Sequence, residues 1–113
     1  MFDSVTYVAL NSAADSLALR QRVIANNIAN INTPNFQATR VQFEDELARQ
    51  VARGNGAVQA TQKLSLEPTR LDGNNVNLDT ETLLNIDTVL RYQVATRAID
   101  GTFSNLRTAM RTS

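Results

Sequence analysis

The chain of 113 residues contains no cysteine, no histidine and no tryptophan. Without cysteine it forms no disulfide and offers no thiolate nucleophile, and without both cysteine and histidine the common zinc sites are excluded. The missing histidine also removes the general base that works most often near neutral pH. Serine and threonine therefore have no histidine partner for a catalytic triad, and an enzyme is not expected.

Charge is balanced and aromatic side chains are scarce. Lys+Arg and Asp+Glu each number 11, so the formal net charge is zero, whereas a general nucleic-acid binder carries a basic excess that neutralises phosphates. A net charge of zero does not oppose association of the chain with copies of itself. Aromatic residues make up 5% of the sequence, which does not favour a thick globular core.

Long apolar runs are also missing. No run approaches the roughly 20 residues that span a bilayer, so direct insertion into a membrane is not expected. The first five residues lack the basic segment and the continuous apolar core of a secretory signal. We therefore expect a soluble protein that, if it is exported, leaves the cytoplasm without a cleaved signal peptide.

The first third of the chain has the periodicity of one long helix. Apolar residues recur at spacings of three and four between Ser4 and Ile31, which predicts a helix over that range. A seven-residue repeat within it is typical of the contact row of a coiled coil. The members of this repeat are Leu10, Leu17, Ile24 and Ile31. Asp3 or Ser4 is expected to cap the helix, and Pro34 to end it.

A second helical pattern occupies the end of the chain, and it predicts one helix from about Thr80 to Arg111. Asp79 is the expected N-cap, and Gly101 is a weak position that costs about 1 kcal/mol relative to alanine. The apolar row with alternating steps of three and four consists of Val89, Tyr92, Thr96, Ile99, Phe103, Leu106 and Met110. A flanking row consists of Leu83, Ile86 and Leu90.

The middle of the chain is less regular. The spacing from Phe43 to Val51 predicts a short amphipathic helix, and the alternation from Val58 to Leu66 predicts a half-exposed strand. The segment from Asp72 to Asn75 is rich in residues that tolerate positive φ and is predicted to be a turn.

The predicted fold is therefore mainly α. Two long terminal helices form coiled-coil-like packing around a short, partly irregular insert that holds a short helix and a strand-like segment. We divide the chain into residues 1–34, 35–78 and 79–113. Each apolar row is longer than one insert can cover, which predicts burial against other chains. The predicted subunit-interface residues are Leu10, Leu17, Ile24, Ile28, Ile31, Val89, Tyr92, Ile99, Phe103, Leu106 and Met110.

The densest acidic cluster, Glu44-Asp45-Glu46, is interpreted as a solvated helix face. Three successive carboxylates on a helix point in three directions, so they do not hold one metal ion together. No glycine-rich phosphate loop precedes a helix, because Gly54 and Gly56 are followed by a strand-like stretch. Neither a cofactor nor a metal site is predicted.

Asparagines gather at the end of the first predicted helix, and two interpretations of them stay open. They are Asn26, Asn27, Asn30, Asn32 and Asn35. In the first interpretation, their amides satisfy the free carbonyl groups at the helix end. In the second, Asn26 and Asn30, which lie one turn apart, form hydrogen bonds with neighbouring subunits.

The segment from Asn27 to Phe36 resembles the N-terminal motif of the flagellar rod and hook proteins, Asn-Ile-Ala-Asn-x-x-Thr-Pro-Gly-Phe/Tyr. The matching residues are Asn27, Ile28, Ala29, Asn30, Thr33, Pro34, Asn35 and Phe36. Asn35 stands where the family usually has glycine. Because asparagine is the residue that best replaces glycine at positive φ, we expect Asn35 to adopt a left-handed conformation and the turn to survive.

The segments Asp72 to Glu81 and Leu90 to Gln93 are similar to the short proximal-rod members of this family. The resemblance implies a structural subunit of the proximal rod, on the periplasmic side of the inner membrane, that self-assembles through its terminal helices and transmits torque. It implies export by the flagellar type III apparatus and contacts with rod proteins of the FlgC and FlgF types, the basal adaptor FliE and the membrane ring. The alternatives are the related rod protein FlgC, or a helical interaction module such as a flagellar export chaperone or regulator.

Overall fold

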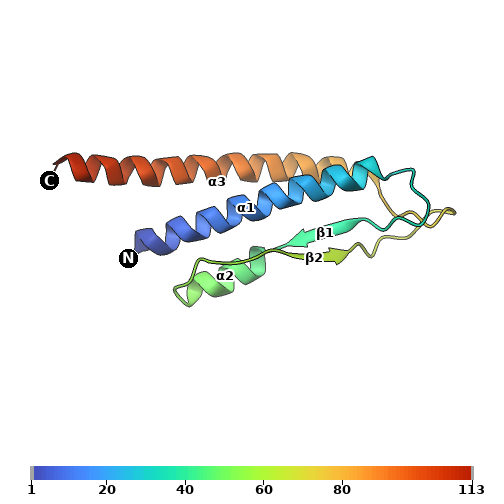
Figure 1. Cartoon of the computed structure of the whole chain (residues 1–113), viewed down its shortest axis with the longest axis horizontal. Coiled ribbons are helices and arrows are strands. Elements are labelled where there is room, and N and C mark those ends of the chain that lie inside the picture. The colour runs from blue at the N-terminus through green and yellow to red at the C-terminus, as the bar shows by residue number, and fades with distance from the viewer. Residues whose placement is uncertain (1, 113) are drawn as a thin grey trace.

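The computed structural model describes the backbone of residues 2–112 and the side chains of residues 4–105 and 107–111. The elements in order are α1 (Phe2–Ala29), β1 (Thr39–Gln42), α2 (Glu44–Ala52), β2 (Thr61–Leu64) and α3 (Leu78–Thr112). The molecule is elongated, with extents of 66 × 25 × 15 Å. Helices α1 and α3 run antiparallel, and the insert packs mainly against α1 (Figure 1). The mainly α fold with two long packed helices is thus confirmed.

Helix α1 differs from its prediction at both ends. It begins at Phe2, so Asp3 and Ser4 lie within its first turn instead of capping it. It ends at Ala29, ahead of Pro34, because the chain then tightens into turns in which the Asn30 N–H is shared between the carbonyls of residues 26 and 27, at 3.2 and 3.1 Å. Proline therefore follows the helix end rather than causing it directly.

Helix α3 is continuous through Gly101, as predicted. Its cap is Asn77 and not Asp79, because the helix begins two residues earlier than expected. The Asn77 Oδ1 accepts hydrogen bonds from the backbone N–H groups of Asp79 and Thr80, at 3.1 and 3.3 Å. Asp79 then joins Glu81 in the first turn, where the positive end of the helix dipole favours acidic side chains.

The insert contains the predicted short helix, α2, and a two-stranded sheet. Strand β2 pairs antiparallel with β1, with Thr39 opposite Leu64 and Gln42 opposite Thr61. Strand β1 was not predicted. The predicted strand, Val58 to Leu66, is shorter in the structure. Its predicted half-burial is wrong for β2, whose four side chains are exposed, whereas Val58 and Ala60 before it are half-buried. Helix α1 packs against β1, whereas β2 lies further out and has no helix over it (Figure 1).

The apolar core is small and lies where α1, α3 and the insert meet. Its main cluster is Leu17, Phe43 and Ala95 with partly buried neighbours that include Ala13 and Ala14, and Ile24, Ala38, Val41 and Val76 are also buried. Small alanine side chains allow the helices to approach closely, but they remove little apolar surface from water. The fold therefore depends strongly on polar contacts near the C-terminal end of α1 and the N-terminal end of α3.

Candidate functional site

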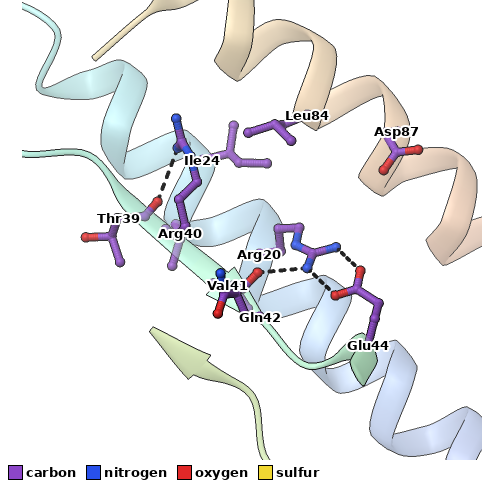
Figure 2. Close-up of a pocket in the computed structure, with 10 residues that line it drawn as sticks. Arg20, Ile24, Thr39, Arg40, Val41, Gln42, Glu44, Leu84 and Asp87 are labelled. Carbon is purple, nitrogen blue, oxygen red and sulfur yellow. Dashed lines mark hydrogen bonds and ion pairs between the residues drawn. The ribbon is translucent and has the colours of Figure 1, made fainter. Parts of the chain in front are cut away.

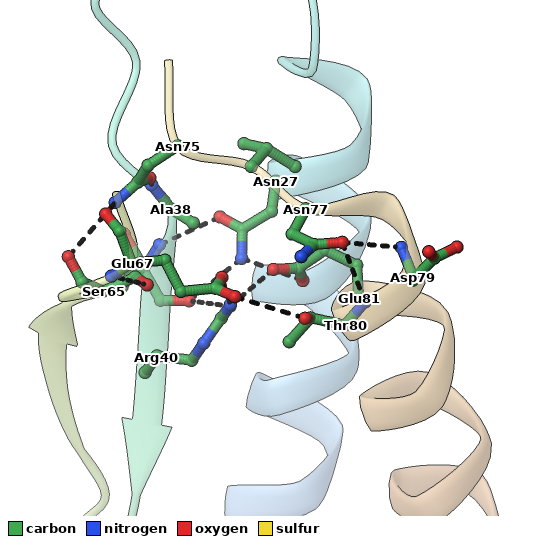
Figure 3. Close-up of polar contacts among 12 residues, drawn as sticks. Asn27, Ala38, Arg40, Ser65, Glu67, Asn75, Asn77, Asp79, Thr80 and Glu81 are labelled. Carbon is green, nitrogen blue, oxygen red and sulfur yellow. Dashed lines mark hydrogen bonds and ion pairs between the residues drawn. The ribbon is translucent and has the colours of Figure 1, made fainter. Parts of the chain in front are cut away.

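Asn27 joins three elements near the end of α1, and its side chain is fully buried. The Nδ2 group donates to the carbonyl of Thr39 in β1, at 2.9 Å, and to the Glu81 carboxylate of α3, at 3.1 Å. The Oδ1 atom accepts from the Thr39 N–H, at 3.0 Å (Figure 3). The amide thus pairs with the free edge of β1 as a neighbouring strand would, and it closes that edge.

Glu81 is the acidic centre of this network, and its side chain is 0% exposed. The Arg40 guanidinium of β1 forms an ion pair with it at 2.5 Å and also reaches Glu67, at 3.3 Å (Figure 3). A buried carboxylate is tolerated only when it is paired and hydrogen-bonded, and here both oxygens have partners. Arg40 and Asn27 therefore fix the position of α3 relative to α1 and the sheet.

The predicted turn at residues 72–75 completes the network. The buried Asn74 amide donates to the carbonyls of Asn30 and Thr33, each at 2.8 Å, and so satisfies free carbonyl groups after α1. The Oδ1 of buried Asn75 accepts from the Ala38 N–H, at 2.7 Å. The turn therefore binds the end of α1 to the start of the sheet.

Asn35 has φ of 62°, which confirms the predicted left-handed conformation. Its N–H donates to the carbonyl of Asp72, at 2.8 Å, and Gly73 in the facing turn also has positive φ, at 81°. A Cβ atom on Gly73 would collide with the Asn35 side chain, so the two turns pack directly on each other. The left-handed residue is needed for this close contact.

The Asn26 and Asn30 side chains lie in the helix end itself. The Asn30 Nδ2 donates to the Asn26 carbonyl, at 2.8 Å, and its Oδ1 accepts from the Thr33 hydroxyl, at 3.0 Å. These contacts are those of the first interpretation, in which amides satisfy carbonyls at the helix end. Contacts of Asn26 and Asn30 with neighbouring subunits stay a prediction. In the rest of the motif, Ile28, Ile31 and Phe36 are half-buried, and Ala29, Thr33, Pro34 and Asn35 are exposed.

A second polar contact joins α2 to the helices. The Arg20 guanidinium of α1 binds both oxygens of Glu44, at 2.7 and 2.8 Å, and donates to the Val41 carbonyl, at 2.7 Å (Figure 2). The hydrogen bond from Arg20 lowers the pKa of Glu44, although partial burial opposes the shift. Arg91 of α3 approaches the same carboxylate at 3.6 Å. Interpreting the acidic cluster only as a solvated face is therefore wrong for Glu44, which bridges three elements.

The other acidic residues of that cluster remain at the surface. Glu46 forms an exposed ion pair with Arg49, and hydrogen bonds from Gln50 and Arg49 lower the pKa of Glu46. Beside Glu44, a groove of about 280 Å³ lies between α1, β1 and α3, with Leu84 and Asp87 on its α3 side (Figure 2). Among the side chains that the structure describes, no group of three acidic residues is arranged to hold a metal ion.

The predicted interface residues fall into three sets. Leu17 and Ile24 are 3% exposed and are covered by other elements of the same chain. The half-buried residues are Leu10, Ile28, Ile31, Val89, Tyr92 and Ile99. Phe103 and Met110 are exposed, and the side chain of Leu106 lies outside the described residues. Contact of any of these residues with another subunit stays a prediction.

The largest exposed apolar row of α3 is on its outer face. Leu83, Ile86, Leu90 and Val94, which we call the outer stripe, are 54–69% exposed. Sequence spacing placed the first three of them only in a flanking row. The opposite face of the helix buries Glu81 and Thr88. Large exposed apolar patches are, in general, typical of surfaces that contact other molecules.

The end of α3 runs past the N-terminus of α1 (Figure 1). We call the residues from Phe103 to Thr112 the overhang, and every side chain that the structure describes in it is exposed. Arg107 lies over the ring of Phe103, at 5.6 Å from its centroid. Across residues 2–112, no helix has the length and apolar character that crossing a membrane requires.

Comparison with known proteins identifies relatives of the chain. The family model described as "Flagella basal body rod protein" matches residues 9–37, which include the asparagine motif. A relative from Escherichia coli (strain K12) is 34% identical over 106 residues, covering 74% of this chain and 77% of the relative. One from Cereibacter sphaeroides is 32% identical over 117 residues, covering 87% and 90%. One from Bacillus subtilis (strain 168) is 29% identical over 118 residues, covering 89% of each chain.

All three relatives are named flagellar basal body rod protein FlgB. Two of them exceed 30% identity over most of both chains, so the similarity is not limited to the motif that rod and hook proteins share. These alignments also extend beyond the helix end that carries the asparagine network. The chain belongs to the FlgB family of structural proteins of the bacterial flagellar basal body rod.

Proposed function

We propose that this chain assembles with copies of itself and with other rod proteins into the proximal rod, through exposed faces of its terminal helices, and that it transmits torque there. The outer stripe carries the proposal. Its four apolar side chains are 54–69% exposed in the single chain. Covering such surface gains about 25 cal/mol per Å² of apolar area, so a neighbouring subunit is favoured on that face.

The buried polar network supports the torque-transmitting role. A subunit under load must keep its two helices in register, and apolar contacts alone allow small slides between helices. The Arg40–Glu81 ion pair and the Asn27 hydrogen bonds are directional, and they join α1, β1 and α3 at one place. A slide of one helix would break all of these contacts together.

Family membership supports the remaining parts of the proposal. The subunit has no enzymatic activity and lies on the periplasmic side of the inner membrane, after type III export without a cleaved signal peptide. Its neighbours are rod proteins of the FlgC and FlgF types, the adaptor FliE and the membrane ring. Residues 1–34 and 79–113 supply the axial helices, and residues 35–78 form the variable insert.

The test replaces the chromosomal gene in the bacterium that encodes this chain with a Leu90→Asp variant. A charge in the outer stripe should prevent packing of the neighbour, so cells should lack rods in electron micrographs of isolated basal bodies and should not swim. The matched control is Leu71→Asp, because Leu71 lies on the insert and is fully exposed. Normal swimming of the Leu90→Asp strain would contradict assembly through this face.

A further inference from the structure

Helix α3 separates its charges along its length. Residues 78–90 contain three acidic residues, Asp79, Glu81 and Asp87, and no Lys or Arg. Residues 91–112 contain four arginines and one aspartate. The helix dipole favours Asp79 and Arg111 in the terminal turns, but its effect falls off within one turn and does not account for Asp87 or Arg107. The separation therefore leaves acidic and basic side chains on different stretches of the same helix.

The exposed charges share rows with apolar side chains. Asp79, Leu83 and Asp87 follow one another at spacings of four, so they line one side of the helix beside the outer stripe. At the other end, Phe103, Arg107 and Arg111 also follow at spacings of four and are exposed. One end of α3 thus presents an acidic row with leucine, and the other end presents a basic row with phenylalanine.

Among the described residues, the ion-pair and ring contacts of both rows lie within α3 itself. Asp87 forms an exposed ion pair with Arg91 at 2.9 Å, and Arg107 lies over the ring of Phe103 in its own row. Glu81, by contrast, is buried and neutralised by Arg40. The two rows are complementary in charge, and both carry apolar surface, but they lie at opposite ends of one helix and do not meet within the chain.

We propose that the overhang of α3 in one copy docks on the outer stripe of α3 in the next copy. Arg107 and Arg111 then lie beside Asp79 and Asp87, and the ring of Phe103 covers part of the apolar stripe. This inference rests on the proposed self-assembly and specifies which surfaces meet. Because the two surfaces differ, the contact is heterologous and leaves one free surface of each kind, so a third copy can add to a pair by the same contact.

The experiment reverses the charges of each row in the full-length chain and measures association by sedimentation velocity at low salt. In the D79R/D87R variant both rows are basic, and in the R107D/R111D variant both are acidic. Each variant alone should associate about tenfold or more weakly than the wild type, because like charges oppose each other across the contact. An equimolar mixture should regain association to within about threefold of the wild type, since each basic row then meets an acidic one.

The R53D/K63D variant is the matched control for R107D/R111D, because it makes the same change in net charge on exposed residues of the insert, and it should associate like the wild type. Helix content by circular dichroism confirms that each variant folds. Unchanged association of the two row variants, or a mixture that stays dissociated, would overturn this contact and leave self-assembly standing. A wild-type chain that remains monomeric up to about millimolar concentration would overturn self-assembly and the contact with it.

Discussion

In the first half of α3, the face that packs against the rest of the chain buries polar side chains, and the opposite face exposes apolar ones. On the inner face, Glu81 and Thr88 are 0% exposed, whereas on the outer face Leu83 and Val94 are each 69% exposed. A helix at the surface of a globular domain normally turns its apolar stripe inwards. The inner face gives the subunit a specific structure, and the apolar outer face adds little to that structure. The outer face is thus the one available to a neighbour.

A similar contrast separates the two ends of the hairpin. At the turn end, every buried side-chain nitrogen or oxygen among the described residues has a hydrogen-bond partner. Towards the C-terminus, the side chains described in the overhang are all exposed. The subunit is therefore held together mainly from its turn end, and substitutions there should affect stability far more than substitutions in the overhang.

The largest effect is expected from Arg40→Met, which removes the cation beside buried Glu81. Losing one partner of a buried pair leaves an uncompensated charge and costs about 3–5 kcal/mol in the free energy of unfolding. Urea unfolding measures this loss. The matched control is Arg49→Met, which breaks an exposed ion pair with Glu46 and should leave stability close to that of the wild type. Equal midpoints for the two variants would show that the buried network does not hold the inner face.

A smaller effect is expected at Asn35, whose left-handed conformation brings two turns together. Asn35→Val should lower the free energy of unfolding by about 1–3 kcal/mol, because a β-branched side chain is strained at positive φ. Asn35→Gly should match the wild type or be slightly more stable, since glycine has no Cβ penalty there. Thermal unfolding of the two variants gives the order of their stabilities. A valine variant as stable as the glycine variant would argue against the strained turn.

The smallest effect concerns the Arg20–Glu44 contact, and it depends on pH. Because Arg20 lowers the folded-state pKa of Glu44, the ionised carboxylate stabilises the fold above the ordinary glutamate pKa of about 4.3. This contribution is lost as the pH falls through the lower folded-state pKa. With Glu44 partly exposed, Glu44→Gln should cost about 1 kcal/mol near pH 7, and the difference from the wild type should shrink towards pH 3. A difference that stays constant over this range would mean that the ion pair contributes nothing.

The long helices and the Asn35 turn could be predicted from sequence because their causes are local. Apolar spacing of three and four indicates a helix. Asn35 stands where the flagellar rod and hook proteins usually have glycine, and asparagine tolerates the left-handed region better than most residues. The pairing of β1 with β2 could not be predicted in this way, because alternation indicates a strand only at the β2 segment and because the two partners lie far apart in the sequence. The same holds for Asn27, whose amide meets a carboxylate 54 residues away in Glu81.

The candidate site was only partly accessible to the same reasoning. Spacing shows that Leu83, Ile86 and Leu90 share a face of α3, but not which face the rest of the chain covers. The inner face was harder to recognise from the sequence, because Glu81 and Thr88 at its centre are polar residues that are usually exposed. The positions of Arg40 and Asn27, which bind the two carboxylate oxygens, explain why Glu81 is inside. Long-range polar pairing thus decides which apolar row remains outside.

The central claim is that the outer stripe serves neighbouring subunits and not the fold of its own chain. The most direct test measures the stability and the self-association of one variant, Ile86→Ser/Leu90→Ser. We predict that its free energy of unfolding in dilute solution stays within about 0.5 kcal/mol of the wild type, as for other surface substitutions, while association in sedimentation equilibrium is lost. A loss of about 2–5 kcal/mol, as expected when buried leucine is truncated, together with unchanged association, would contradict it.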